Sequence, residues 1–93
     1  MKFIHLGKGT LVRDDEILGI FDLDITSQSH LTRKFLSLAD KSGKVINAAE
    51  DLPKSFVVAE KNGRETVYLS QLNSATLLRR AESGFFDSLS IEH

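Results

Sequence analysis

The segment Gly7-Lys8-Gly9-Thr10 carries residue types that bind phosphate groups. In a phosphate-binding loop, two glycines are separated by four residues and followed directly by Lys and then Ser or Thr, with a helix after them. Here Gly9 separates Lys8 from Thr10, and a β-prone run follows instead of a helix. We therefore interpret this segment as a plain turn.

A second group that could do chemistry is acidic. Asp14, Asp15, Glu16, Asp22 and Asp24 lie within one short stretch of the sequence. Paired carboxylates can hold a hard cation such as Mg²⁺, but this spacing does not match the Asp-x-Asp-x-Asp-Gly pattern of a calcium loop. The favoured interpretation is a solvated turn, and we expect no bound metal and no other cofactor.

No catalytic arrangement stands out among the remaining residues. His5 and His30 belong to different predicted elements without a second ligand at metal spacing, and His93 is the terminal residue. A serine nucleophile needs a strained elbow, whereas Ser55 and Ser70 fall in predicted strands. The sequence has no cysteine, which excludes thiol catalysis and cysteine-based zinc sites. We predict that the chain is not an enzyme and see no small-molecule substrate.

The first half of the sequence predicts three short strands and a helix. The β-prone runs cover residues 3–6, 11–12 and 17–21, and residues 22–26 are predicted to connect the last run to the helix. Ser27 or Ser29 can cap the helix, and Gly43 can end it in the left-handed conformation. Helical spacing places four apolar residues on one face. These are Leu31, Phe35, Leu38 and Ala39.

The second half predicts a further strand over residues 44–47, a loop over 48–53 and then a hairpin. Residues 55–59 and 66–70 form the strand pair, because Asn62-Gly63 can supply the two positive φ angles of a tight turn. With this turn, Phe56 faces Leu69, Val58 faces Val67 and Val57 faces Tyr68. The same register sets Glu60 opposite Glu65, an unfavourable like-charge pair that leaves a looser tip as an alternative.

We predict one α+β domain over residues 1–93. Its sheet is small and mostly antiparallel, with five to six strands and two short helices in the order βββαβββα. The second helix begins at Asn73 or Ser74 and ends near residues 83–84. The tail, residues 83–93, contains four large apolar residues, so we expect it to dock on the body. These are Phe85, Phe86, Leu89 and Ile91.

The hairpin is apolar on both faces, and both faces therefore need cover. Two short helices are too few for this, so we predict that a second copy of the chain covers the remaining face or a helix side. Val57 and Tyr68, which share one face of the hairpin, are the predicted interface residues. The alternative is a monomer whose tail folds over the open face.

The sequence is nearly neutral, with 12 Lys and Arg against 13 Asp and Glu. This excludes a uniformly basic protein that coats nucleic acid, whereas a local basic patch depends on the distribution of charge. Residues 27–46 carry a net charge of +3. No run reaches the ~20 apolar residues of a membrane span, so we expect no membrane partner. The basic residues of the positive stretch are Arg33, Lys34, Lys41 and Lys44.

Four motifs occur in a specific order and spacing: Ile4-His5-Leu6-Gly7, then residues 17–22, then residues 53–58, then the pattern Tyr68-Leu69-Ser70, Leu72, Ser74, Thr76-Leu77 and Arg80-Ala81. Together they resemble the RemA/RemB family of small bacterial extracellular matrix regulatory proteins, its RemB members most closely, over about residues 3–82. The resemblance implies a cytoplasmic α+β protein that forms homo-oligomers. It also implies a role in transcription, because RemA activates biofilm matrix genes, assembles into rings and binds DNA through arginines.

The family's arginines fall on Glu16 and near Asp51 and Leu52 in this sequence, while Arg80 matches a basic position in the last helix. If double-stranded DNA is bound, other basic residues must contact it. We predict Arg13, Lys44 and Lys54, which lie at strand ends near the family's basic loops. The first hypothesis is therefore an oligomeric DNA-binding regulator of matrix genes. The alternative is an oligomeric protein-interaction module or scaffold without DNA binding, which the acidic substitutions favour.

Overall fold

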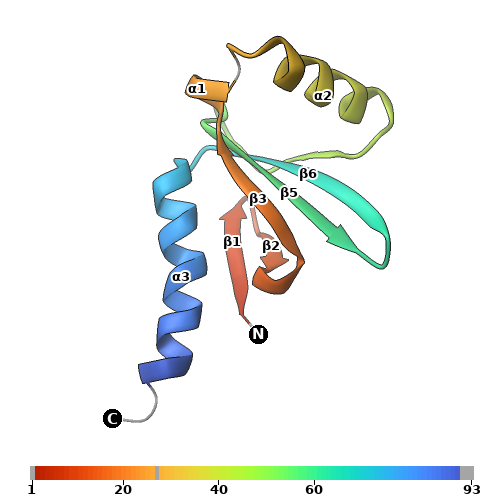
Figure 1. Cartoon of the computed structure of the whole chain (residues 1–93). Helices are drawn as coiled ribbons and strands as arrows, with labels where there is room; N and C mark the ends of the chain where they lie inside the picture. The colour runs from red at the N-terminus through yellow and green to blue at the C-terminus, as the bar shows by residue number, and fades with distance from the viewer. Residues whose placement is uncertain (1, 27, 91–93) are drawn as a thin grey trace.

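A computed structural model describes the backbone of residues 2–26 and 28–90 and the side chains of these residues up to Glu82. Figure 1 shows that the strands form two sheets, with the helices around them. In chain order the elements are β1 (Phe3–Gly7), β2 (Thr10–Arg13), η1 (Asp14–Glu16), β3 (Ile17–Asp22), α1 (Leu23–Thr26), α2 (His30–Lys41), β4 (Val45–Asn47), β5 (Ser55–Lys61), β6 (Arg64–Ser70) and α3 (Ser74–Ser90).

The α+β class is confirmed, but the single sheet of five to six strands is wrong. Strands β1 and β2 pair with each other in a two-stranded sheet, and the other four form a sheet in the order β3-β5-β6-β4. The small hairpin packs against a face of the larger sheet instead of extending its edge. In the larger sheet, β4 is parallel to β6 and the other pairings are antiparallel.

Strands β5 and β6 are joined by the predicted tight turn. Asn62 and Gly63 have φ angles of 52° and 79°, the positive values that a two-residue hairpin turn requires. The predicted register is confirmed, with Val57 opposite Tyr68. The pairing continues to the turn and includes Glu60 opposite Glu65, so the tip is not loosened.

One face of the larger sheet, which we call the Val57 face, is covered by the hairpin β1–β2 and by α3. Its core contains the following buried side chains: Ile4, Leu6, Val12, Ala48, Val57, Ala59 and Leu77. The buried Ser70 links the two sheets, because its hydroxyl donates a 2.7 Å hydrogen bond to the carbonyl oxygen of Leu6. This face is therefore closed by the chain itself.

The opposite face, the Phe56 face, packs against α2. The ring of Phe56 stacks on Phe21 at 4.9 Å between centroids and contacts Phe35 at 6.4 Å. On α2, Ala39 is buried and Phe35 is half-buried. Leu31 and Leu38, which share the predicted apolar stripe, stay exposed. The helix therefore covers this face in part.

The ends of α2 follow the prediction. The hydroxyl of Ser29 accepts a hydrogen bond from the backbone N–H of Thr32, which caps the start. Gly43 has a φ angle of 71°, and the N–H of Lys44 bonds to the carbonyl oxygen of Ala39. This pattern of bonds closes many helices behind a left-handed glycine.

The predicted end of the last helix near residues 83–84 is wrong, because α3 continues to Ser90. Asn73 caps its start, accepting a bond from the N–H of Thr76. Glycine inside a helix costs about 1 kcal/mol relative to alanine, which is too little to end one by itself. The predicted docking of the tail through its apolar side chains lies outside the described side chains. A one-turn helix, α1, also replaces part of the predicted connection over residues 22–26.

The glycines of the first hairpin offer a test of how the two sheets are joined. Gly7 and Gly9 both have positive φ angles, 132° and 72°. A methyl group on Gly7 would overlap the carbonyl oxygen of Ala48, whereas one on Gly9 would meet open space. We expect Gly7→Ala to lower the free energy of unfolding by about 3 kcal/mol, from strain plus overlap. Gly9→Ala should cost only about 1 kcal/mol.

Urea unfolding followed by circular dichroism measures both variants. Equal losses of stability for the two glycines would show that Gly7 does not pack closely against Ala48.

Candidate nucleic-acid interface

The three residues predicted to contact DNA do not form one patch. Lys44 precedes β4, and its carbonyl oxygen accepts a bond from the N–H of Val67, in the middle of β6. Lys54 precedes β5, and its N–H donates to the carbonyl oxygen of Ser70, at the end of β6. Arg13 ends β2 in the other sheet. The fold therefore spreads these cations over different parts of the surface.

Arg13 is already paired. Its Nε and Nη2 atoms donate to the two carboxylate oxygens of Asp15, at 3.1 and 2.7 Å. This hydrogen bonding raises the pKa of Arg13 and lowers the pKa of Asp15. Because Asp15 already occupies two donors of this guanidinium and offsets its charge, Arg13 is the weakest of the three predicted DNA contacts.

A different group of cations is brought together where α3 passes β1. Lys2, Arg79 and Arg80 line an open pocket of about 410 Å³, together with Thr76. We call these three cations the α3 basic cluster. Both arginines are exposed. Positive groups on an exposed face, with a hydroxyl donor among them, are the chemistry that binds phosphate oxygens.

Backbone contacts hold the α3 basic cluster in place. Nη1 of Arg80 donates a 2.9 Å hydrogen bond to the carbonyl oxygen of His5, which fixes the side chain beside β1. The Lys2 backbone pairs with Asp14, whose N–H donates to the Lys2 carbonyl oxygen and whose carboxylate accepts from the Lys2 N–H. The cluster therefore joins the first residues of the chain to its last helix, with one carboxylate nearby.

The net charges of consecutive segments do not reveal this cluster. Lys2 lies in residues 1–26, whose net charge is −2, and Arg79 and Arg80 lie in residues 73–93, whose net charge is −1. The signal that was available is the adjacent arginine pair in a predicted helix. Its pairing with Lys2 depends on contact between distant segments, which local patterns do not contain.

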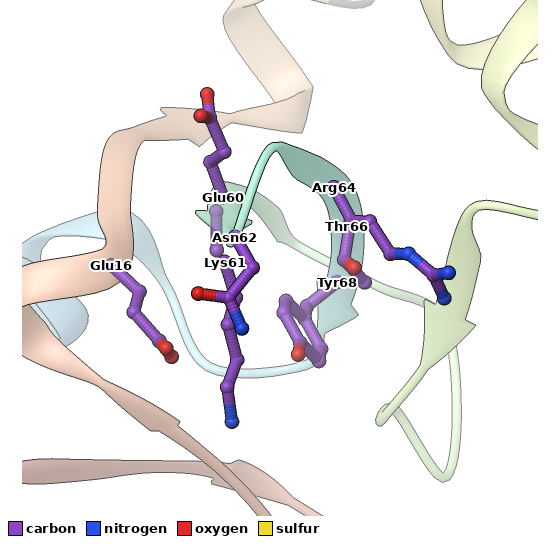
Figure 2. A pocket seen from close by; sticks show the side chains of 8 residues that line it. Glu16, Glu60, Lys61, Asn62, Arg64, Thr66 and Tyr68 are labelled. Carbon is purple, nitrogen blue, oxygen red and sulfur yellow. The ribbon is translucent and has the colours of Figure 1, made fainter.

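A second polar pocket lies beside the turn between β5 and β6 and has a volume of about 560 Å³. Figure 2 shows Lys61 and Tyr68 on one side of the strands and Glu60 pointing away from them. Lys61 lies opposite Arg64, and Glu16 from η1 also lines the pocket. Because cations and carboxylates alternate here, this pocket is less suited to the phosphate backbone than the α3 basic cluster.

An apolar groove opens on the Phe56 face, between β3 and α2. It has a volume of about 350 Å³ and is lined by Leu18, Gly19, Phe21, Leu31, Thr32, Phe35, Phe56 and Val58. Exposed apolar surface of this kind marks interaction sites more often than free surface. The groove is therefore a candidate surface for contact with a partner.

The two residues predicted to form a subunit interface lie on the other face. Val57 has no exposed surface, since the hairpin β1–β2 and α3 of the same chain cover it. Tyr68 is half-buried at the margin of that core. The hairpin β1–β2 covers this face in addition to α3, which the sequence pattern of two helices did not predict. The Phe56 face is the one left partly open.

The structure also places the other candidate motifs. Lys8 and Gly9 form a tight hairpin turn with positive φ angles, so the interpretation of this segment as a turn is confirmed. Within residues 2–26 and 28–82, no three His, Asp or Glu side chains come together as a metal site. Among the described helices, none combines the length and the apolar character needed to span a membrane.

The fold and its surfaces define a small α+β protein with a basic cluster on one side and an apolar groove on the other. The family model described as RemA-like, extracellular matrix regulatory protein A-like, matches residues 3–81. Extracellular matrix regulatory protein B of Bacillus subtilis (strain 168) is 36% identical over 83 residues, which cover 89% of this chain and 94% of that protein. The chain therefore belongs to the RemA-like family, and the resemblance to RemB is confirmed.

The hydroxyl of Tyr68 offers a test of the pocket beside Glu16. The pKa of Tyr68 is raised above its ordinary value of about 10. Burial of the hydroxyl is the larger cause, and the negative charge of Glu16 is the smaller one. Since the pKa is higher in the folded chain, the folded state favours the protonated hydroxyl. The stability that depends on this protonated form is complete below pH 10, the ordinary pKa of tyrosine. It is lost as pH rises through the folded pKa.

Tyr68 is the single tyrosine and the chain has no tryptophan, so tyrosinate absorbance reports this residue alone. We expect its titration midpoint in the folded protein to exceed that in urea. Glu16→Gln should lower the midpoint in part, while Glu60→Gln, which removes the same charge from a side chain pointing away, should leave it unchanged. Equal midpoints in the folded and unfolded chains would contradict this assignment.

Proposed function

We propose that this chain is a self-associating bacterial regulator of extracellular matrix genes that contacts double-stranded DNA through the α3 basic cluster. Membership of the RemA-like family supports the regulatory role, and the names of the family model and of the Bacillus subtilis relative both refer to matrix regulation. The convergence of Lys2, Arg79 and Arg80 on one exposed pocket carries the DNA-binding part of the proposal.

The chemistry of the cluster suits phosphate contacts more than base reading. Arginine and lysine donate to phosphate oxygens, and such contacts position a protein on the duplex without reading its sequence. Arg80 is fixed beside β1, while Arg79 extends from the same turn of α3 into solvent. The proposed contact is therefore electrostatic and low in sequence specificity.

Self-association would raise the affinity for DNA above that of a single α3 basic cluster. The α3 basic cluster of one chain holds three cations, and the chain as a whole carries a net charge of −1. When several copies hold their clusters in a fixed arrangement, the second contact becomes intramolecular and the total affinity rises steeply. The partly open Phe56 face supports an assembly, because large exposed apolar residues gather there.

A second candidate function is an oligomeric interaction module that binds no DNA. The carboxylates near the turn of β5 and β6 favour it, since Glu60 lies opposite Glu65 and Glu16 lines the neighbouring pocket. The two functions differ in their response to duplex DNA at low salt, where phosphate contacts are strongest.

Fluorescence anisotropy with a labelled DNA duplex measures the affinity of the purified chain for DNA. We expect the chain to bind at low salt and its affinity to fall steeply as the salt concentration rises. Each neutralised phosphate contributes a slope of about −0.9 to the plot of log affinity against log salt. Arg79→Gln should reduce the steepness by about one unit for each subunit that contacts the duplex.

Lys34→Gln is the matched control, because Lys34 is an exposed lysine on α2, outside the cluster. It should leave the slope unchanged. Lys54→Gln and Lys44→Gln test the contacts predicted from the sequence in the same assay. Absence of binding at low salt would defeat the DNA-binding proposal, whereas an unchanged slope for Arg79→Gln would reject only the assignment to the α3 basic cluster.

A further inference from the structure

Two large apolar surfaces remain exposed in one copy of the chain. The first is the groove on the Phe56 face, where Leu31 is 76% exposed and Leu18 is 62% exposed. Phe35 lies deeper in the groove and is half-buried. Both leucines stand on the rims, one on α2 and one on β3, so a side chain entering between them would meet apolar surface on both sides.

The second surface is the outer face of the hairpin β1–β2. Successive side chains of a strand point to opposite faces. Ile4, Leu6 and Val12 point inward and are buried, whereas Phe3 and Leu11 point outward and are 56% and 55% exposed. In the strand register, Phe3 lies opposite Arg13 and Leu11 lies opposite His5, which makes the two apolar residues diagonal neighbours.

The two surfaces lie on opposite sides of the larger sheet. The hairpin β1–β2 and α2 lie on opposite sides of the larger sheet (Figure 1). The hairpin packs on the Val57 face, and the groove between β3 and α2 opens on the Phe56 face. Neither can therefore cover the other within one chain. A contact between two copies can cover both at once if the hairpin of one meets the groove of the next.

Charge fits this arrangement. Glu60 and Glu65 lie directly opposite each other, on the same face as Val58 and next to the groove along β5 and β6. Like charges in this position repel, and a cation from a neighbour relieves the repulsion. The hairpin carries Lys8 at its turn, where the side chain is exposed. The acidic margin of the groove and the basic turn of the hairpin are therefore complementary.

We propose that the outer face of the hairpin β1–β2 docks into the groove of a second copy of this chain, with Phe3 and Leu11 seated between Leu18 and Leu31. The proposal rests on the self-association proposed above and identifies the surfaces that form it. Because the two surfaces differ, the contact is head-to-tail, and each copy keeps one free surface for the next. Pairing of groove with groove would instead leave Phe3 and Leu11 uncovered.

Complementary variants test the proposal. Leu31→Glu removes the groove and keeps the hairpin, whereas Leu11→Glu removes the hairpin face and keeps the groove. We expect the unaltered chain to assemble and each variant alone to sediment as a monomer. An equimolar mixture of the two variants should form a dimer, because one intact hairpin and one intact groove remain. Sedimentation velocity at a fixed micromolar concentration measures all of these states.

Controls separate loss of docking from loss of folding. Leu52→Glu places the same charge on a residue that is 80% exposed and lies outside both surfaces, and it should assemble as the unaltered chain does. Circular dichroism checks that each variant is folded. Leu18→Glu and Phe3→Glu form a second complementary pair, to be used if either member of the first pair unfolds.

The outcomes distinguish this inference from the proposed function. Normal assembly of Leu11→Glu would overturn the docking proposal, and so would a mixture of two folded monomeric variants that stays monomeric. In both cases the unaltered chain still assembles, so self-association itself would stand. A monomeric unaltered chain would reject self-association and the docking proposal together.

Discussion

The pairing of β5 with β6 is the interaction on which the rest of the structure depends. Asn62 and Gly63 set its register, and the register sorts the side chains of both strands onto two faces. Val57 then points to one face and Phe56 to the other, and both are buried. A shift of one residue would exchange the two sets of side chains. Strands β3 and β4 extend this pair at its edges, and the hairpin β1–β2, α2 and α3 cover its two faces.

The two faces are covered unequally. The Val57 face is covered by a hairpin and a helix. The hydroxyl of the buried Ser70 both donates a hydrogen bond to the carbonyl oxygen of Leu6 and accepts one from the N–H of Leu72. The Phe56 face receives α2, which is short and turns part of its apolar stripe to solvent. The unequal cover explains why the α3 basic cluster and the groove lie on different sides of the sheet. The cluster lies on α3, which closes the Val57 face, and the groove is the part of the Phe56 face that α2 leaves uncovered.

Local signals in the sequence predicted local structure well. Ser29 and Gly43 mark the ends of α2, and Asn62-Gly63 gives the hairpin register, because each acts through hydrogen bonds or φ angles within a few residues. The split into two sheets could not be predicted in this way, since it depends on packing between distant strands. The same limit applies to the α3 basic cluster, where Lys2 meets a helix at the other end of the chain.

Near-neutral net charge and an exposed basic cluster are compatible in this fold because the charges are separated in space. Glu60 and Glu65 lie at the margin of the Phe56 face, while Arg79 and Arg80 lie on α3, which packs on the Val57 face. At physiological salt, interactions between exposed charges fade beyond about 8 Å, so a carboxylate on one side of the sheet weakens a distant cation little. A head-to-tail contact would bring the acidic margin against a neighbouring chain and leave the arginines facing solvent. Association would then increase the positive character of the accessible surface, even though each chain carries a net charge of −1.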